Sequence, residues 1–229
     1  MKLEKTTKRD MSATNRRYGD ACAVAHALEL IGDRWALLVA REMMLGARRF
    51  SGIRRGLPGI SANVLTQRLE EMEAAGLVER QEEDGIVRYA LTPWGQELET
   101  VTQALGRWGA RSHGHDPSLP FGPTSLMLSL RTMIDAAKAR ALCDLRAAFT
   151  VGADRFALDL ADGELTIRRG AADAPAFTLA MANPNAILPA LYGPMPLAAA
   201  EAEGRVEVIG DRALAQRFLD LFALPEKAA

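Results

Sequence analysis

Arginines and short side chains gather in one stretch of the chain. No aspartate or glutamate lies between Glu42 and Glu70, but five arginines do, namely Arg48, Arg49, Arg54, Arg55 and Arg68. A stretch with one sign of charge favours an anionic partner, because guanidinium groups bind phosphates. The same stretch holds small and amide side chains of the kind that reach base edges in the major groove of DNA. These are Ser61, Ala62, Asn63, Thr66 and Gln67.

Two helices and a hairpin would have to position these side chains. Residues 50–57 predict a short helix, and Ser61 is the expected N-cap of a second helix that continues to about Ala75. One face of the second helix is apolar (Leu65, Leu69 and Met72) and the other is polar (Asn63, Thr66, Gln67 and Glu70). Asp84-Gly85 indicates a hairpin with Arg80 and Arg88 at its base. This order predicts a winged helix-turn-helix whose second helix enters the major groove while arginines bind phosphates.

Helices on both sides of this unit complete a predicted N-terminal domain over residues 20–112. Apolar spacing predicts a helix over 24–31, and Asp33 is the expected N-cap of the next helix, which ends near Gly46. Pro93 opens a long helix that reaches about Ser112. Its apolar residues repeat close to a heptad and predict a helix-pairing seam, formed by Leu98, Val101, Leu105 and Trp108.

Several motifs of this domain resemble those of the HxlR-type winged-helix regulators. They are CAVAHALELIGDRW at 22–35, RFS at 49–51, LPGIS at 57–61, LTQRL at 65–69 and AGLV at 75–78, and the resemblance covers residues 20–110. It implies a homodimer formed through the terminal helices and a roughly palindromic DNA operator, read by the helix that Ser61 caps. The hairpin tip, Glu82 to Gly85, is acidic where relatives often carry basic residues, which disfavours deep insertion into the minor groove. Ala23 also stands where relatives often have proline.

Cys22 is a candidate redox sensor, because some members of that family respond to oxidants through an early cysteine. It lies near the N-terminus of the first predicted helix, where the helix dipole lowers a thiol pKa. The alternative is that Cys22 is a small buried residue in the dimer. Cys143 is expected in the core. Two distant cysteines indicate reduced thiols rather than a disulfide framework.

Glycines and prolines in residues 113–123 predict a linker to a second domain over 124–229. Helix-like and strand-like runs make that domain a small α+β unit, so the whole chain is predicted to be α+β. Its runs 158–165, 183–193 and 197–211 resemble sterol carrier protein type two, which implies an apolar tunnel between sheet and helices. The tunnel would bind a small apolar ligand, unless its candidate lining is simply core. That lining is Met127, Leu130, Met133, Ile134, Leu188, Leu191, Tyr192, Met195, Phe218 and Phe222.

No catalytic site, metal site or cofactor is predicted. The three histidines, His26, His113 and His115, lack zinc-ligand spacing, and no glycine-rich phosphate loop with a lysine is present. No apolar run approaches the roughly 20 residues of a membrane helix. Residues 1–19 are predicted to be a flexible charged tail without the apolar core of a signal peptide, which favours the cytoplasm.

The leading hypothesis is therefore a dimeric DNA-binding transcriptional regulator that a small apolar ligand modulates. Two alternatives stay open at this point. One is a redox-responsive regulator that acts through Cys22, with the second domain serving only dimer assembly. The other is a lipid-binding protein whose winged helix contacts protein instead of DNA.

Overall fold

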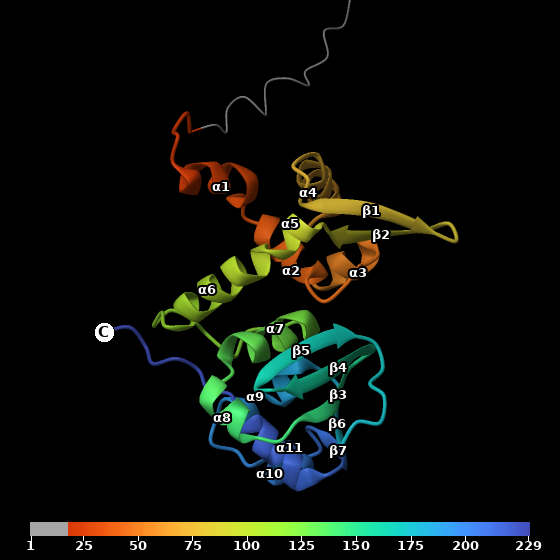
Figure 1. Cartoon of the computed structure of the whole chain (residues 1–229), viewed down its shortest axis with the longest axis vertical. Helices are drawn as coiled ribbons and strands as arrows, with labels where there is room; N and C mark the ends of the chain where they lie inside the picture. The colour runs from red at the N-terminus through yellow and green to blue at the C-terminus, as the bar shows by residue number, and fades with distance from the viewer. Residues whose placement is uncertain (1–17) are drawn as a thin grey trace, which may run out of the picture.

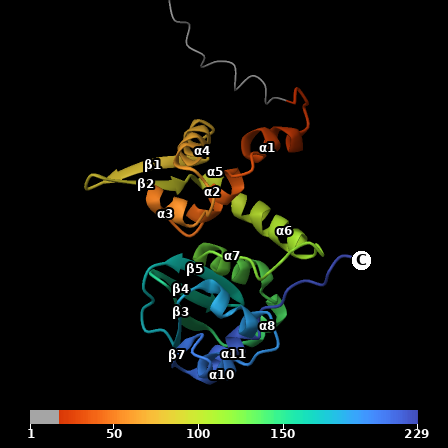
Figure 2. The same ribbon diagram turned by 180° about the vertical axis from the view of Figure 1, so that it is seen from behind.

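The computed structural model describes residues 18–229, so most of the tail predicted for 1–19 lies outside the described residues. The described chain forms two lobes, a mainly helical N-terminal lobe and a C-terminal lobe built on a sheet (Figures 1 and 2). Across the described residues, no helix combines the length and the apolar character that crossing a bilayer requires.

The N-terminal lobe has the element order of a winged helix-turn-helix. It contains α1 (Ala23–Ile31), α2 (Ala36–Met43), α3 (Phe50–Arg55), α4 (Ala62–Ala74), β1 (Val78–Glu83), β2 (Ile86–Leu91), α5 (Pro93–Gln96) and α6 (Leu98–Ala110). Helices α3 and α4 form the helix-turn-helix, and the β1–β2 hairpin is the wing. Leu65 and Leu69 of α4 are buried in one core cluster with Ile53 of α3, as the apolar face predicted.

Local sequence explains where these elements begin and turn. The hydroxyl of Ser61 accepts a 3.2 Å hydrogen bond from the backbone N–H of Val64, so it caps α4 as predicted. Asp84 and Gly85 both have positive φ, 52° and 72°, which is the conformation that a type I′ hairpin turn requires.

Two predictions about the helices of this lobe were wrong. Asp33 does not cap α2, because its carboxylate pairs with Arg68 of α4 and the N-cap position belongs to Trp35. The single long helix predicted from Pro93 is divided into α5 and α6. Around Glu97 the backbone makes i to i−3 hydrogen bonds, which are tighter than those of an α-helix and interrupt its pattern.

The C-terminal lobe is an α+β unit around one five-stranded sheet. Its helices are α7 (Pro123–Met133), α8 (Ala136–Ala141), the short 3₁₀ helix η2 (Pro184–Ala186), α9 (Leu188–Leu191), α10 (Leu197–Ala202) and α11 (Arg212–Leu219). Its strands are β3 (Leu145–Val151), β4 (Asp154–Ala161), β5 (Glu164–Arg169), β6 (Phe177–Met181) and β7 (Glu207–Gly210). The strand order is β5-β4-β3-β6-β7, and only the β3–β6 pair is parallel.

One face of this sheet carries the core. Phe149 pairs with Phe156 of β4 and with Leu179 of β6, and all three side chains are fully buried. Successive side chains of a strand point to opposite faces of the sheet, so Arg146 of β3 is exposed on the face opposite Phe149. Phe218 of α11 packs on the buried face, with its ring centroid 6.3 Å from that of Phe149.

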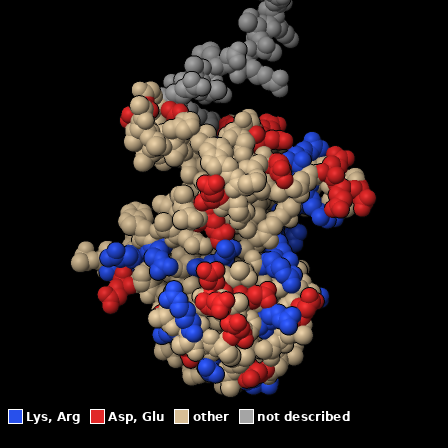
Figure 3. Space-filling model, viewed as in Figure 1, with Lys and Arg blue, Asp and Glu red and all other residues tan. Residues whose placement is uncertain are grey.

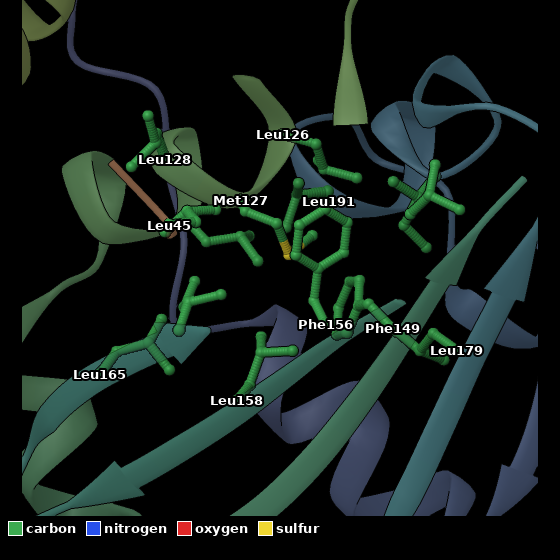
Figure 4. Close-up of a cluster of buried hydrophobic side chains, with 14 of the residues drawn as sticks. Leu45, Leu126, Met127, Leu128, Phe149, Phe156, Leu158, Leu165, Leu179 and Leu191 are labelled. Carbon is green, nitrogen blue, oxygen red and sulfur yellow. The ribbon is translucent and has the colours of Figure 1, made fainter. Parts of the chain in front are cut away.

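The two lobes share a continuous core. Figure 4 shows Leu45, which follows α2, beside Leu128 of α7 and above the buried face of the sheet. The predicted linker is also anchored to the C-terminal lobe. The backbone N–H of Phe121 donates a 3.3 Å hydrogen bond to Asn185 Oδ1, and Asn185 Nδ2 donates a 3.1 Å hydrogen bond to the carbonyl of Leu119. These contacts hold the segment between the lobes in a defined position.

Candidate nucleic-acid interface

Helix α4 presents its polar face to solvent, at the end of the molecule that lies away from the C-terminal lobe (Figure 1). Asn63, Thr66 and Gln67 are exposed on this face, whereas Leu65 is completely buried on the opposite side. The Nε2 atom of Gln67 donates a 3.0 Å hydrogen bond to Glu71 Oε1, which orients the amide along the outer surface. Ser61 is exposed and Ala62 half-buried at the start of the helix. Amide and hydroxyl groups in this position can hydrogen-bond to base edges.

Exposed arginines lie on the neighbouring helix. Arg49 occupies the N-cap position of α3, and Arg54 and Arg55 lie in its last turn. All three side chains are exposed, and α3 precedes α4 by one short turn. Guanidinium groups beside a reading helix can bind phosphates and so position that helix on the duplex.

Two of the predicted arginines do not lie on this surface. Arg68 is 9% exposed, and its guanidinium pairs with Asp33 and Glu71. Arg48 pairs with Glu42 at 2.5 Å and with Asp154 of the C-terminal lobe at 3.5 Å. Carboxylates of the protein itself thus pair with the guanidinium groups of both Arg48 and Arg68. This corrects the expectation that all the arginines of the acid-free stretch lie on one basic surface.

The wing carries mixed charge. Arg88 lies 3.6 Å from Glu83 and Arg80 lies 3.9 Å from Glu82, so each basic side chain is close to a glutamate of the same hairpin. Figure 3 shows acidic side chains gathered toward the tip of this hairpin beside the basic ones. Acidic groups at the tip would repel phosphates, so the geometry favours contact through the base of the wing alone.

Helices α1 and α6 expose apolar side chains. Val101, Leu105 and Trp108 of α6 are 43%, 46% and 74% exposed, and Val24 and Leu28 of α1 are also exposed. Leu98, the fourth predicted residue of the seam, is half-buried and lines a shallow apolar hollow between α1 and α6. Exposed apolar surface of this kind marks an interaction site.

Both cysteine thiols are exposed. Cys22 is the N-cap residue of α1, and the backbone N–H groups of Ala25 and Val24 lower the pKa of its thiol. Cys143 was expected in the core but lies at the surface, in the segment between α8 and β3. No group of three or more His, Cys, Asp or Glu side chains that could hold a metal occurs within residues 18–229.

Most of the predicted tunnel lining forms the core of the C-terminal lobe instead. Buried core residues are Met127, Leu130, Leu191, Phe218 and Phe222, and Ile134 and Met195 pack against them. Met133, Leu188 and Tyr192 line a cavity that lies between the lobes rather than between sheet and helices. The buried residues of the predicted lining therefore pack as part of the hydrophobic core.

A buried ionic cluster joins the lobes, and no local pattern in the sequence indicates it. Glu42 is 1% exposed and accepts hydrogen bonds from Arg41, Arg48 and Thr124. Arg169 of β5 bonds to Asp154 and to the same Thr124 hydroxyl. Gly56 packs directly against the Glu42 carboxylate, where any side chain would collide with it. Arg41 and Arg48 lie within six residues of Glu42, but Thr124 lies 82 residues away in the chain, so only the fold brings the whole cluster together.

Comparison with known proteins places the N-terminal lobe among regulators. The HxlR-like helix-turn-helix family matches residues 30–116. The HTH-type transcriptional regulator sll1512 of Synechocystis sp. is 35% identical over 95 residues, which are 40% of this chain and 70% of the relative. The regulator YybR of Bacillus subtilis is 34% identical over 93 residues, which are 39% of this chain and 74% of YybR. The solved structure of the redox regulator HypR in its oxidised form is 33% identical, with a TM-score of 0.39, and the match covers 41% of this chain and all of HypR (100%).

Proposed function

The chain belongs to the HxlR-like helix-turn-helix family of transcriptional regulators, and from that premise we propose that it binds a roughly palindromic DNA operator as a homodimer. Helix α4 enters the major groove, where Asn63, Thr66 and Gln67 contact base edges. Arg49, Arg54 and Arg55 bind phosphates on the flanking backbone. The observation that carries this proposal is the exposed polar face of α4 beside the exposed arginines of α3.

The homodimer forms through α1 and α6. Their exposed apolar side chains are the surface that a second copy would cover, and Trp108 at 74% exposure is the largest of them. A two-fold dimer presents two copies of α4 to half-sites about one helical turn of DNA apart, or a multiple of that distance. Such a protein acts in the cytoplasm, where the DNA of a bacterial or archaeal cell lies.

A small apolar ligand in contact with the C-terminal lobe modulates DNA binding. Helix α7 of that lobe packs against both α6 and α2, so it touches the proposed dimer helix and the core of the winged helix at once. A ligand that prefers one arrangement of these helices shifts the dimer toward the arrangement it prefers.

Cys22 supports a second proposal, that oxidants also modulate the regulator. Its thiol is exposed, and backbone N–H groups lower its pKa, which raises the fraction of reactive thiolate. Replacing Cys22 with serine would then remove the response to oxidant and leave DNA binding intact.

Selection of genomic fragments by the full-length protein at two salt concentrations tests the main proposal. We expect a short inverted repeat whose affinity falls steeply with salt, because each phosphate contact contributes a slope of about −0.9 in log–log units. Arg54→Ala should retain less DNA at the higher salt concentration, while Arg217→Ala, an exposed arginine of α11 in the other lobe, should behave as wild type. Recovery of no enriched sequence, or the same loss in both variants, would contradict the proposal.

A further inference from the structure

A cavity of about 230 Å³ lies between the two lobes. Helix α6 forms one wall, α7 and α9 form another, and the segments before α7 and after α11 complete it through Phe121 and Leu224. Ligand pockets for drug-sized molecules measure roughly 300–1,000 Å³, so this cavity suits a smaller molecule. Most of its surface is apolar and comes from side chains such as Leu128, Met133 and Leu188.

Hydroxyl groups interrupt the apolar wall. The hydroxyls of Ser129 and Tyr192 are 2.6 Å apart, and burial raises the pKa of Tyr192 to about 12, so its phenol stays protonated at neutral pH. Thr102 of α6 also lines the cavity, and its Oγ1 atom is buried without a hydrogen-bond partner among the described residues. Buried polar atoms are rarely left unpaired, so an unpaired hydroxyl in a cavity wall indicates that a ligand or a water completes it.

The charges around the cavity favour an anion. Its lining contains the charged side chain of Arg41 but no aspartate or glutamate. Arg41 belongs to the ionic cluster that joins the lobes, in which the guanidinium groups of Arg41, Arg48 and Arg169 face the carboxylates of Glu42 and Asp154. Three positive charges against two negative charges leave an excess of one positive charge beside the cavity. Burial, followed by the neighbouring charge of Arg48, lowers the pKa of Arg169, whereas Asp154 and Glu42 act in the opposite direction.

We propose that this cavity binds a small apolar carboxylic acid, with its carboxylate toward Arg41 and the Thr102 hydroxyl and its apolar part against Leu128, Met133 and Leu188. The proposal deepens the ligand-modulated function proposed above and rests on it for its biological role. The site differs from the tunnel predicted inside the C-terminal lobe.

The position of the cavity connects the ligand to the dimer. Gly106 and Thr102 lie on α6, the same helix that exposes Leu105 and Trp108 on its other side. The segment after α11 closes the cavity and is tied to the end of α6, because Lys227 Nζ donates hydrogen bonds to the carbonyls of Ala110 and Ser112 at 3.1 and 2.9 Å. A bound acid therefore contacts α6, the proposed dimer helix, and also the segment after α11 that joins the C-terminal lobe to α6.

Titration of the full-length protein with 2-naphthoate tests the site, and 2-naphthamide is the uncharged probe of matched shape. We expect calorimetry to show that naphthoate binds at least about tenfold more tightly than naphthamide, because a charge-assisted hydrogen bond is about twice as strong as a neutral one. Failure of the wild type to bind naphthoate at millimolar concentration, or equal affinity for the two probes, would overturn the proposal.

Two glycines of α6 provide a matched pair of variants. A Cβ at Gly106 would have Thr132 Cγ2 at 3.9 Å as its nearest neighbour, so Gly106→Leu should fill the cavity without a clash. Gly109 does not line the cavity, and a Cβ there would meet nothing within 4 Å. Gly106→Leu should weaken naphthoate binding at least tenfold, whereas Gly109→Leu should bind it as the wild type does. Equal binding by both variants would place the probe elsewhere and refute the site.

Two further variants test the head group. Arg41→Met should remove the preference for naphthoate over naphthamide, and Arg41→Lys should restore part of it. Thr102→Val should weaken naphthoate binding without lowering the denaturation midpoint, because it removes a hydroxyl that is unpaired in the free protein. An unchanged preference in Arg41→Met would refute the assignment of the carboxylate to Arg41.

Operator binding separates this proposal from the proposed function. Naphthoate should change the affinity of the wild type for its operator several-fold and leave that of Gly106→Leu unchanged. A protein that binds naphthoate but no operator would refute the DNA-binding function and leave the cavity assignment standing. A protein that binds its operator but not naphthoate would refute the cavity assignment alone.

Discussion

The carboxylate of Glu42 in α2 accepts a 2.9 Å hydrogen bond from the hydroxyl of Thr124 in α7. This bond joins the winged helix to the C-terminal lobe, and both residues are 1% exposed. Arg41 and Arg48 pair with the same carboxylate from the N-terminal side. The two lobes thus meet through a buried charge whose partners come from both of them.

Glu42→Gln should destabilise the whole protein. The substitution leaves guanidinium groups buried without their shared carboxylate, and removing one partner from a buried ion pair costs about 3–5 kcal/mol. Chemical denaturation measures this loss in the free energy of unfolding. Glu73→Gln on the exposed side of α4 is the control and should change stability by less than about 0.5 kcal/mol. Equal effects of the two substitutions would mean that the cluster does not stabilise the fold.

Trp108→Glu should convert the dimer into a monomer, because it places a charge on the exposed apolar face of α6. Light scattering after size-exclusion chromatography would show the mass fall by half. Ile209 in β7 is 55% exposed and lies in the other lobe, so Ile209→Glu should leave the mass unchanged. A Trp108→Glu protein that keeps its full dimer mass would rule out this seam.

Cys22 should react with iodoacetamide faster than Cys143 does. Both thiols are exposed, but backbone N–H groups lower the pKa of Cys22 and so favour its thiolate. The reaction rate of Cys22 should rise with pH through a midpoint below the usual thiol pKa of about 8.5, and peptide mapping by mass spectrometry would follow each cysteine separately. Equal rates at both positions would remove the physical basis of a redox role.

Arg54→Ala should weaken binding to all DNA sequences by a similar factor. A phosphate contact carries no sequence information, so base preference should stay the same while the slope of log affinity against log salt falls by about 0.9.

Arg68→Ala should act through stability and not through a lost phosphate contact, since Arg68 pairs with Asp33 and Glu71 inside the protein. Its loss should lower stability first, which thermal denaturation would detect.

Signals within a few residues of each other predicted the elements well. Ser61 and Val64 form the expected cap, and Asp84-Gly85 forms the expected hairpin turn, because both depend on neighbouring residues only. The apolar and polar faces of α4 also followed from spacing alone.

Predictions that depended on distant residues failed. Asp33 was predicted to cap a helix, but its carboxylate accepts a hydrogen bond from Arg68, which lies 35 residues later in the chain. Arg48 looked like a surface residue, but it pairs with Asp154 of the other lobe. In the C-terminal lobe, apolar spacing correctly indicated buried side chains such as Phe218. It could not show where a cavity remains, because the position of the cavity depends on how distant segments pack against one another.

The base preference of Gln67→Ala tests the central claim most directly. The experiment measures affinity for a set of operator variants, each changed at one base pair, for the wild type and for Gln67→Ala. If α4 reads the major groove, the variant loses discrimination at one position in each half-site, by about 1–3 kcal/mol, and keeps it at the others. An affinity loss of equal size at every position, with all base preferences retained, would show that α4 is not the reading helix.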